Sequence, residues 1–322
     1  MNGHENRIQI FEPFGAAYEL MKTILFRPFD MAKWFAIAFA AFISGSWGGG
    51  GFNPGRLGRF GSGNWKYRST THGYTPGDWT MPAWGIALII IAGLVVLVLA
   101  VLLMWVAARG RFIFTDCVVK NRGAIAEPWR EFRREGNSFF LFSFAVAVVA
   151  MFLTAIVILI VAVPLGLFST HHGSGFGAAA IIALIIFGLV WVAFALFFAL
   201  VSQFMIPVMY RRRCSAREAF LDVAKLLLHQ PGPFVLYVLF GIVLVIAVGI
   251  VGTVISCLTC CIGALPYIST VLLLPAIVWL AGFKLLFLRQ FGDQYDVWAT
   301  VGLPPVAVPP AAPPPAAPIA PA

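Results

Sequence analysis

Long runs of apolar residues without a charged side chain dominate this sequence. Four of these runs contain no Asp, Glu, Lys, Arg or His, and they cover Met81–Ala108, Ser138–Val163, Phe176–Pro207 and Phe234–Ile255. Each is longer than the roughly 20 residues with which a helix crosses the hydrocarbon core of a bilayer. Two further apolar segments carry charges only near one end. The pattern predicts an all-α integral membrane protein with six transmembrane helices, at residues 29–47, 84–108, 139–163, 178–206, 234–255 and 267–288.

The last two predicted spans come from one apolar stretch, between Phe234 and Leu288. A single helix of that length, rising about 1.5 Å per residue, would be far longer than a bilayer core of about 30 Å. Gly263 and Pro266 disfavour a helix, so we expect the chain to turn back between Cys257 and Pro266.

A more polar segment with a helical stripe of apolar side chains precedes each pair of spans. The stripes are Phe11, Phe14, Tyr18, Met21 and Leu25 in the first unit, Trp129 and Phe132 in the second, and Phe220, Val223 and Leu227 in the third. The opposite faces are charged, and Pro or Gly follows each stripe. This order predicts three hairpins, each preceded by an interfacial amphipathic helix. A short similarity between residues 112–124 and 204–216 indicates parallel repeats around a pseudo-threefold axis.

Composition and charge support the membrane interpretation. Hydrophobic residues make up 61% of the chain and charged residues only 11%, far below the roughly 25% typical of soluble domains. The net charge of +9 could suggest a nucleic-acid partner, but the Lys and Arg residues lie beside the apolar runs. There they set orientation and contact anionic lipid head groups, so we expect lipids and no nucleic acid as partners.

Basic residues also predict the orientation. Eighteen of the 22 Lys and Arg residues lie near the two termini or in the two connections after the second and fourth spans. By the positive-inside rule, both termini and these connections lie in the cytoplasm, and the protein is in the cell inner membrane. Charged residues interrupt the first 30 residues, so the first span is expected to be its own targeting signal.

The membrane domain is expected to cover residues 1–298. Residues 45–79 mix Gly with aromatic and basic residues, which favours a flexible outer loop over a substrate lid. Residues 299–322 are rich in Pro and Ala and predict a disordered tail.

One cluster has the spacing of a metal or redox site. Cys257, Cys260 and Cys261 lie in a predicted outward turn, and His171 and His172 lie in another. If the two turns met, a mixed thiolate and imidazole site would be feasible. The favoured interpretation is small packing residues or a structural disulfide, so no cofactor is expected.

Basic residues after the fourth span are candidates for binding lipid head groups. They are Arg211, Arg212, Arg213, Arg217 and Lys225. The alternative, which we favour, is that this cluster only sets topology. Lys284 is expected to extend its ammonium to the nearby membrane surface.

Missing motifs limit the possible functions. The span centres hold no carboxylates, which disfavours an ion-coupled transporter. No metalloprotease, α/β-hydrolase or P-loop pattern occurs. We therefore expect a non-catalytic membrane protein that organises lipid or a membrane protein partner. A permease for an uncharged or lipid-like solute and a redox or metal protein using the Cys cluster are the alternatives.

The third unit carries a resemblance to a known group. Its features are the segment Ala216–Pro233 before Phe234, the motif C-x-x-C-C...L-P-Y...L-P over Cys257–Pro275, and Gln290-Phe291-Gly292. With these features the chain resembles a diffuse group of uncharacterised bacterial six-span membrane proteins, including relatives of the membrane domain of glycerophosphodiester phosphodiesterases. The resemblance implies a bacterial six-span protein and no catalytic residues, because the catalytic domain of the phosphodiesterases is absent here.

Overall fold

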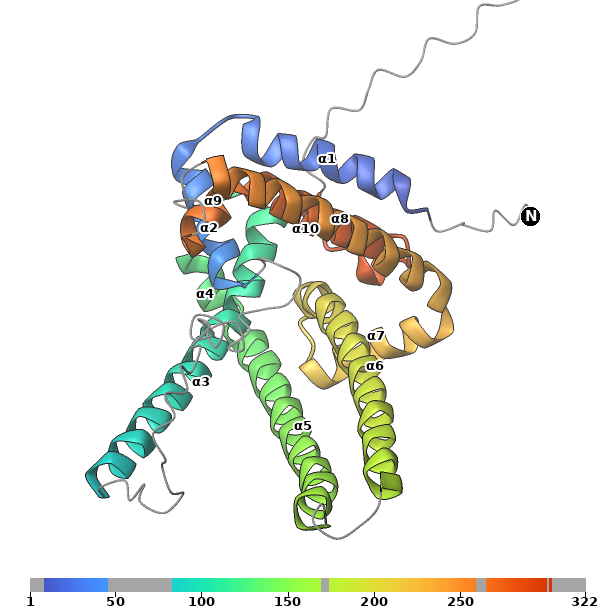
Figure 1. Ribbon diagram of the computed structural model, residues 1–322. Coiled ribbons are helices and arrows are strands. Elements are labelled where there is room, and N and C mark those ends of the chain that lie inside the picture. The colour runs from blue at the N-terminus through green and yellow to red at the C-terminus, as the bar shows by residue number, and fades with distance from the viewer. Residues whose placement is uncertain (1–8, 46–82, 169–173, 259–264, 300, 303–322) are drawn as a thin grey trace, which may run out of the picture.

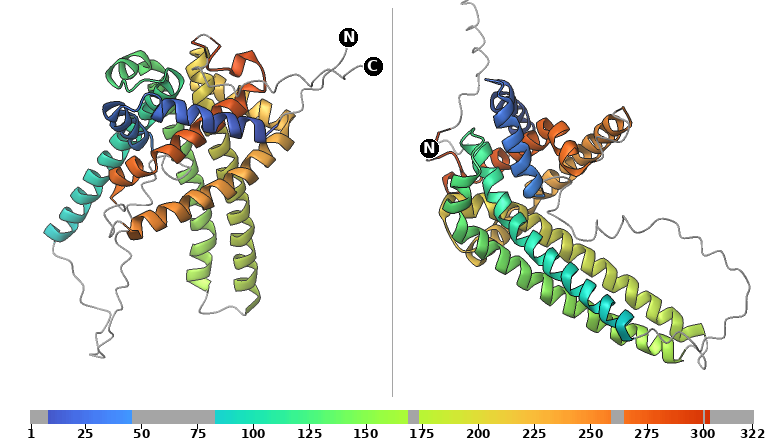
Figure 2. Two further views of the ribbon diagram at one scale, coloured as in Figure 1. Left: turned by 90° about the horizontal axis from the view of Figure 1, so that it is seen from above. Right: turned by 90° about the vertical axis from the view of Figure 1, so that its left-hand side faces the viewer.

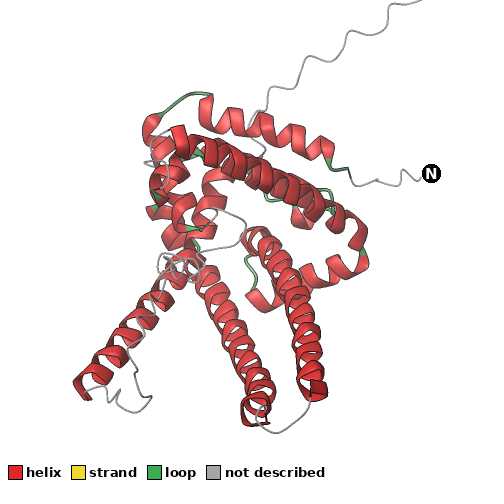
Figure 3. Ribbon diagram, in the orientation of Figure 1, coloured by secondary structure: helices red, strands yellow, loops and turns green. Residues whose placement is uncertain are grey.

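The computed structural model describes residues 9–45, 83–168, 174–258, 265–299 and 301–302. Most of the predicted outer loop and of the Pro-rich tail lies outside the described residues. The first six helices are α1 (Phe11–Phe26), α2 (Met31–Ile43), α3 (Ala83–Val119), α4 (Ala126–Glu131), α5 (Arg133–Phe168) and α6 (Ser174–Arg212). The others are α7 (Ala216–His229), α8 (Pro231–Leu258), α9 (Pro266–Leu272), α10 (Leu274–Arg289) and the 3₁₀ turn η3 (Asp293–Tyr295). All regular structure in these residues is helical, as predicted (Figure 3).

Four helices are long and apolar enough to cross a membrane: α3, α5, α6 and α8. In their most apolar windows no more than 11% of the residues are buried inside the protein. Side chains such as Leu94, Val96 and Leu189 are about 60% exposed or more. An apolar surface of this extent is stable only against lipid or another protein, and helices satisfy their backbone hydrogen bonds in lipid. The structure thus has the character of a helical membrane protein.

The first predicted span, 29–47, contains a shorter helix. α2 has thirteen residues and is therefore about 20 Å long, against about 30 Å for the bilayer core. Asp30 begins it by accepting a hydrogen bond from the backbone N–H of Ala32 at 2.9 Å. Lys33 donates to the backbone oxygen of Ile24 and to Asn121, at 2.7 and 2.6 Å. Asp30 and Lys33 are therefore both hydrogen-bonded to other groups of the protein. That this segment crosses the membrane stays a prediction.

The sixth predicted span, 267–288, is divided in two. α9 ends before Leu273, whose φ of −90° and ψ of 6° are not helical, and α10 starts at the next residue. Pro275 lies in the first turn of α10, where its missing N–H costs no helical hydrogen bond. The structure shows no unbroken helix of spanning length here, so this crossing also stays a prediction.

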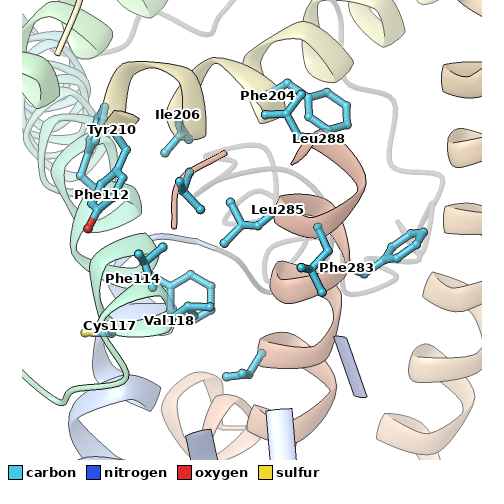
Figure 4. Packing of buried hydrophobic residues seen from close by; sticks show 14 of the residues in the cluster. Phe112, Phe114, Cys117, Val118, Phe204, Ile206, Tyr210, Phe283, Leu285 and Leu288 are labelled. Carbon is cyan, nitrogen blue, oxygen red and sulfur yellow. The ribbon is translucent and has the colours of Figure 1, made fainter. Parts of the chain in front are cut away.

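The short helices gather at one end of α3, α5 and α6, where α8 also lies beside α10 (Figure 1). α3, α5 and α6 extend together from this end, and α1, α4 and α7 lie around it (Figures 1 and 2). α1 packs along α10, where Gly282 allows Leu20 and Ala17 to approach closely. Among the described residues, the buried apolar residues form a continuous core at this end, where α3, α6 and α10 meet (Figure 4).

The predicted apolar stripes lie only partly against the protein. In α1, Met21 and Leu25 are buried, whereas Phe11 is 79% and Tyr18 is 43% exposed. Phe132 of the second stripe is buried, and so are Val223 and Leu227 of the third. The face of α1 that packs on α10 includes Ala17 and Leu20, which lie beside Gly282, and Phe14 and Tyr18 of the predicted stripe, whose rings lie 4.6 and 5.3 Å from Trp279.

Candidate functional site at the charged end of the bundle

A buried carboxylate joins α3 to α6. The side chain of Asp116 is fully buried and accepts a hydrogen bond from the Tyr210 hydroxyl at 2.9 Å. Lys120 lies 2.9 Å from one carboxylate oxygen, and Arg122 donates to the other from two nitrogens, at 3.0 and 3.1 Å. A buried charge requires such compensation, since removing a carboxylate from water costs several kcal/mol. Asp116 therefore holds together α3, α6 and the loop after α3.

Arg213 extends this network to α4 and α5. It pairs with Glu131, lies 3.6 Å from Glu135, and its guanidinium is 3.9 Å from the ring centroid of Phe132. The Phe132 ring in turn stacks on Tyr210, with centroids 4.8 Å apart. We call Asp116, Lys120, Arg122, Glu131 and Arg213 the charged cluster. Its internal pairing indicates a structural role.

The five predicted lipid-binding residues have three kinds of surroundings. Arg212 pairs with Asp222, and Arg213 belongs to the charged cluster, so both are held by carboxylates. The Nε atom of Arg211 is buried and has no hydrogen-bond partner in the described part of the chain. Arg217 and Lys225 are exposed, and within the same residues neither forms an ion pair. Of the five candidates, these two are the exposed ones that form no ion pair with a described residue, whereas Arg211 is partly buried.

Arg217 and Lys225 belong to an exposed stripe of α7. Positions 217, 221, 225 and 228 lie on one helical face at spacings of four, four and three residues. Leu221 and Leu228 on this face are 55% and 72% exposed. The opposite face, with Val223 and Leu227, is buried. We call these four positions the α7 stripe, and its alternation of basic and apolar side chains is typical of a helix at a membrane surface.

The α7 stripe ends at an apolar groove between α6, α7 and α8. The groove has a volume of about 420 Å³, within the range of small-ligand sites. Its lining includes Phe197 and Leu200 of α6, Leu227 and Leu228 of α7, and Val235 and Leu239 of α8. A hydrocarbon chain could enter this groove while the polar part of the same molecule remained beside α7.

Comparison with known proteins places most of the chain in one family. A family of unknown function, DUF7544, matches residues 8–309. The chain belongs to this family. No curated protein and no solved structure matches it. The match covers every helix from α1 to η3, and the resemblance to the phosphodiesterase membrane domain stays an expectation.

The Cys and His residues of the candidate metal site are not brought together in the described part of this DUF7544 protein. Cys257 is exposed at the end of α8, while Cys260, Cys261, His171 and His172 lie outside the described residues. In the described ranges no group of three or more His, Cys, Asp or Glu could hold a metal ion. Burial raises the pKa of the Cys214 thiol, which disfavours the reactive thiolate there.

Sequence reasoning did not identify the surroundings of Arg109. Its guanidinium lies 4.3 Å from the ring centroid of Trp105 and 5.1 Å from that of Trp129. It also donates to the Oδ1 atom of Asn137 at 2.9 and 3.2 Å. The position of Trp105 four residues before Arg109 was the available signal, because residues at this spacing share a helix face. Arg109 is thus held by aromatic rings and an amide.

Proposed function

We propose that this DUF7544 protein is a non-catalytic multipass protein of the inner membrane that binds and organises anionic lipid. One observation carries the proposal: the basic and apolar α7 stripe runs directly into the apolar groove. Arg217 and Lys225 would attract the head group, and the groove would accept an acyl chain. The other basic candidates nearby pair with carboxylates or are partly buried.

In the proposed architecture, residues 1–298 form three units, and residues 299–322 are a tail outside the membrane. α2 with α3, α5 with α6, and α8 with α9 and α10 form the hairpins, while α1, α4 and α7 are the preceding interfacial helices. Contacts of α2 with α3 and of α5 with α6 support this grouping. Tyr237 of α8 stacks on Phe283 and Phe287 of α10, with centroids 5.4 and 4.8 Å apart.

Hydroxyl groups in the long helices also support a lipid-organising protein over a permease. The Thr154 hydroxyl donates to the Ala150 carbonyl at 2.8 Å, and that of Thr253 donates to Gly249 at 2.9 Å. Ser202 bonds within its own helix in the same way. These hydroxyl groups form their hydrogen bonds within their own helices, so they do not require a polar path for a solute.

The orientation can be tested with single cysteines. In a variant whose native cysteines are Ser, Gly61→Cys should react with a membrane-impermeant maleimide in intact cells, because the connection between the first and second predicted spans carries only four of the 22 basic residues. Glu127→Cys, on exposed α4, should react only after the membrane is opened, because α4 lies at the end that the positive-inside rule assigns to the cytoplasm. Labelling gels give the result, and the reverse pattern would contradict the orientation.

Lipid binding can be tested at the α7 stripe. The variant Arg217→Gln/Lys225→Gln should retain at least about tenfold less phosphatidylglycerol, because each basic residue near an anionic surface contributes about 1 kcal/mol. Native mass spectrometry of the full chain, in nanodiscs with equal phosphatidylglycerol and phosphatidylcholine, measures the bound lipid.

The matched control removes two exposed arginines from the start of α5, in Arg133→Gln/Arg134→Gln. It has the same loss of charge but leaves the groove and the α7 stripe intact. A groove variant, Val235→Trp, should also reduce lipid retention without a change of charge. Equal retention by all four proteins would refute the proposed lipid site.

A further inference from the structure

Arg109 is the first charged residue after the long apolar run Met81–Ala108. It is only 6% exposed, and its guanidinium lies in a corner between the nearly perpendicular indole rings of Trp105 and Trp129. Gly136 of α5 leaves space for the stem of this side chain, because a Cβ atom there would lie 2.9 Å from Cγ of Arg109. The fold thus fixes a cation at the point where the apolar part of α3 ends.

Within the described residues, the hydrogen-bond partner of Arg109 is a neutral amide. Nε and Nη2 of Arg109 both donate to Oδ1 of Asn137, at 3.2 and 2.9 Å. Nε1 of Trp105 donates to the same oxygen at 3.0 Å. Glu135, two residues before Asn137, lies 3.6 Å from Arg213 instead. In the part of the chain that the structure describes, the positive charge of Arg109 therefore has no carboxylate against it.

The hydrogen bonds to Asn137 use one edge of the guanidinium and leave another edge open. An arginine carries five N–H donors in a planar fork, and those not used here lie on Nη1 and Nη2. Nη1 forms no hydrogen bond with a described residue, and it is not one of the buried unpaired atoms in these ranges. Asn137 beside it is exposed. Nη1 and Nη2 together form the edge that binds two oxygens of a phosphate at once.

The surroundings of Arg109 match the head-group level of a bilayer. Trp residues concentrate at membrane–water interfaces, where the indole ring meets both apolar and polar groups. On the same face of α3 as Trp105, Leu102 and Val98 are 52% and 61% exposed. Leu141 of the neighbouring helix α5 is 66% exposed. Acyl chains could therefore lie along these side chains while a phosphate contacts Arg109.

We propose that Arg109 binds the phosphodiester of a phospholipid at the level where α3 leaves the bilayer. A cation away from water is costly without an opposite charge, and a phosphodiester against Nη1 and Nη2 would remove this cost. The contact is made to the phosphate oxygens, so the site accepts phospholipids with and without a net charge. It lies on α3, α4 and α5, apart from the α7 stripe, and does not rest on the proposed function.

Phosphatidylcholine is the probe, since it carries the phosphodiester without a net charge that the α7 stripe could attract. Native mass spectrometry of the full chain from phosphatidylcholine nanodiscs counts the lipids that remain bound. Arg109→Met should retain this lipid about tenfold less than the unmodified protein, because it loses a charge-assisted contact. Arg109→Lys should also retain less, because a lysine keeps the charge but lacks the planar fork.

Asn137→Asp separates lipid binding from a purely structural role. The carboxylate has the shape of the amide, can keep the hydrogen bonds from Arg109 and Trp105, and compensates the cation in place. This variant should unfold at the same or a higher temperature than the unmodified protein, yet retain about tenfold less phosphatidylcholine. Gln294→Glu, at an exposed position of η3, has the same change of charge and should retain the lipid fully.

Two further comparisons identify the source of the phosphate and the site. In neutral detergent, phosphatidylcholine should raise the unfolding temperature and inorganic phosphate should not, because the latter has no acyl chains. Arg217→Gln/Lys225→Gln should retain phosphatidylcholine as the unmodified protein does, so a failure of the α7 site would leave this proposal intact. The proposal is overturned if the unmodified protein retains no phosphatidylcholine, if Asn137→Asp retains it fully, or if inorganic phosphate alone gives the whole stabilisation.

Discussion

Asp116→Asn is expected to lower the free energy of unfolding by about 3 kcal/mol, near the lower end of the range for breaking a buried ion pair. The amide keeps the size of the side chain but removes the charge that compensates Lys120 and Arg122. The loss is limited because both cations are about one quarter exposed and have second carboxylates within reach, Glu131 and Glu127. The measurement is thermal or denaturant unfolding of the protein in lipid nanodiscs.

Glu127→Gln is the matched control, since Glu127 pairs with the same Arg122 at 2.7 Å but its side chain is 65% exposed. An exposed pair contributes at most about 1 kcal/mol, so this variant should be nearly as stable as the unmodified protein. Equal losses from the two substitutions would show that burial of Asp116 does not set the strength of the charged cluster.

Gly110→Ala should destabilise the packing of α2 on α3 by at least about 2 kcal/mol. A Cβ atom at Gly110 would lie 2.5 Å from Cγ2 of Ile43, 2.8 Å from the backbone nitrogen of Ser44 and 2.9 Å from the carbonyl carbon of Ile43. Two of these atoms belong to the backbone, so no side-chain rotation can relieve the overlap. Unfolding temperature in nanodiscs and protease resistance at the end of α2 provide the measurement.

Gly93→Ala in the same helix gives the comparison, because a Cβ atom at Gly93 meets nothing within 4 Å. Alanine is a better helix former than glycine by up to about 1 kcal/mol, so this variant should be neutral or slightly stabilised. If both alanine variants behave alike, the close approach of α2 to α3 is not present in the protein in a bilayer.

The long helices could be predicted because their cause is local in the sequence. A run of some 25 apolar residues has to satisfy its own backbone hydrogen bonds in lipid, and a helix does so without a distant partner. The helix α3 nevertheless extends beyond the predicted second span, from Ala108 to Val119. Its charged extension is stabilised by Tyr210, which is 94 residues away in the sequence.

The surroundings of the candidate binding residues depend even more on contacts between residues that are far apart in the sequence. Five basic residues after the fourth span looked equivalent, yet Arg213 is held by Glu131, 82 residues away, while Arg217 faces outward. The α7 stripe could not be predicted from the sequence either. The apolar periodicity of α7 identifies its buried face, but it gives no information on the groove that α7 forms with α6 and α8.

Composition and periodicity alone determined that the protein is helical and that four long apolar helices could cross a membrane. These features follow from the transfer of apolar side chains and backbone groups out of water, which depends on neighbouring residues. Only the tertiary structure decided which charges are paired and which face of α1 packs on α10. Those outcomes depend on the distances between helices that the sequence separates, because packing energies require direct contact and electrostatic energies weaken as the distance between charges grows.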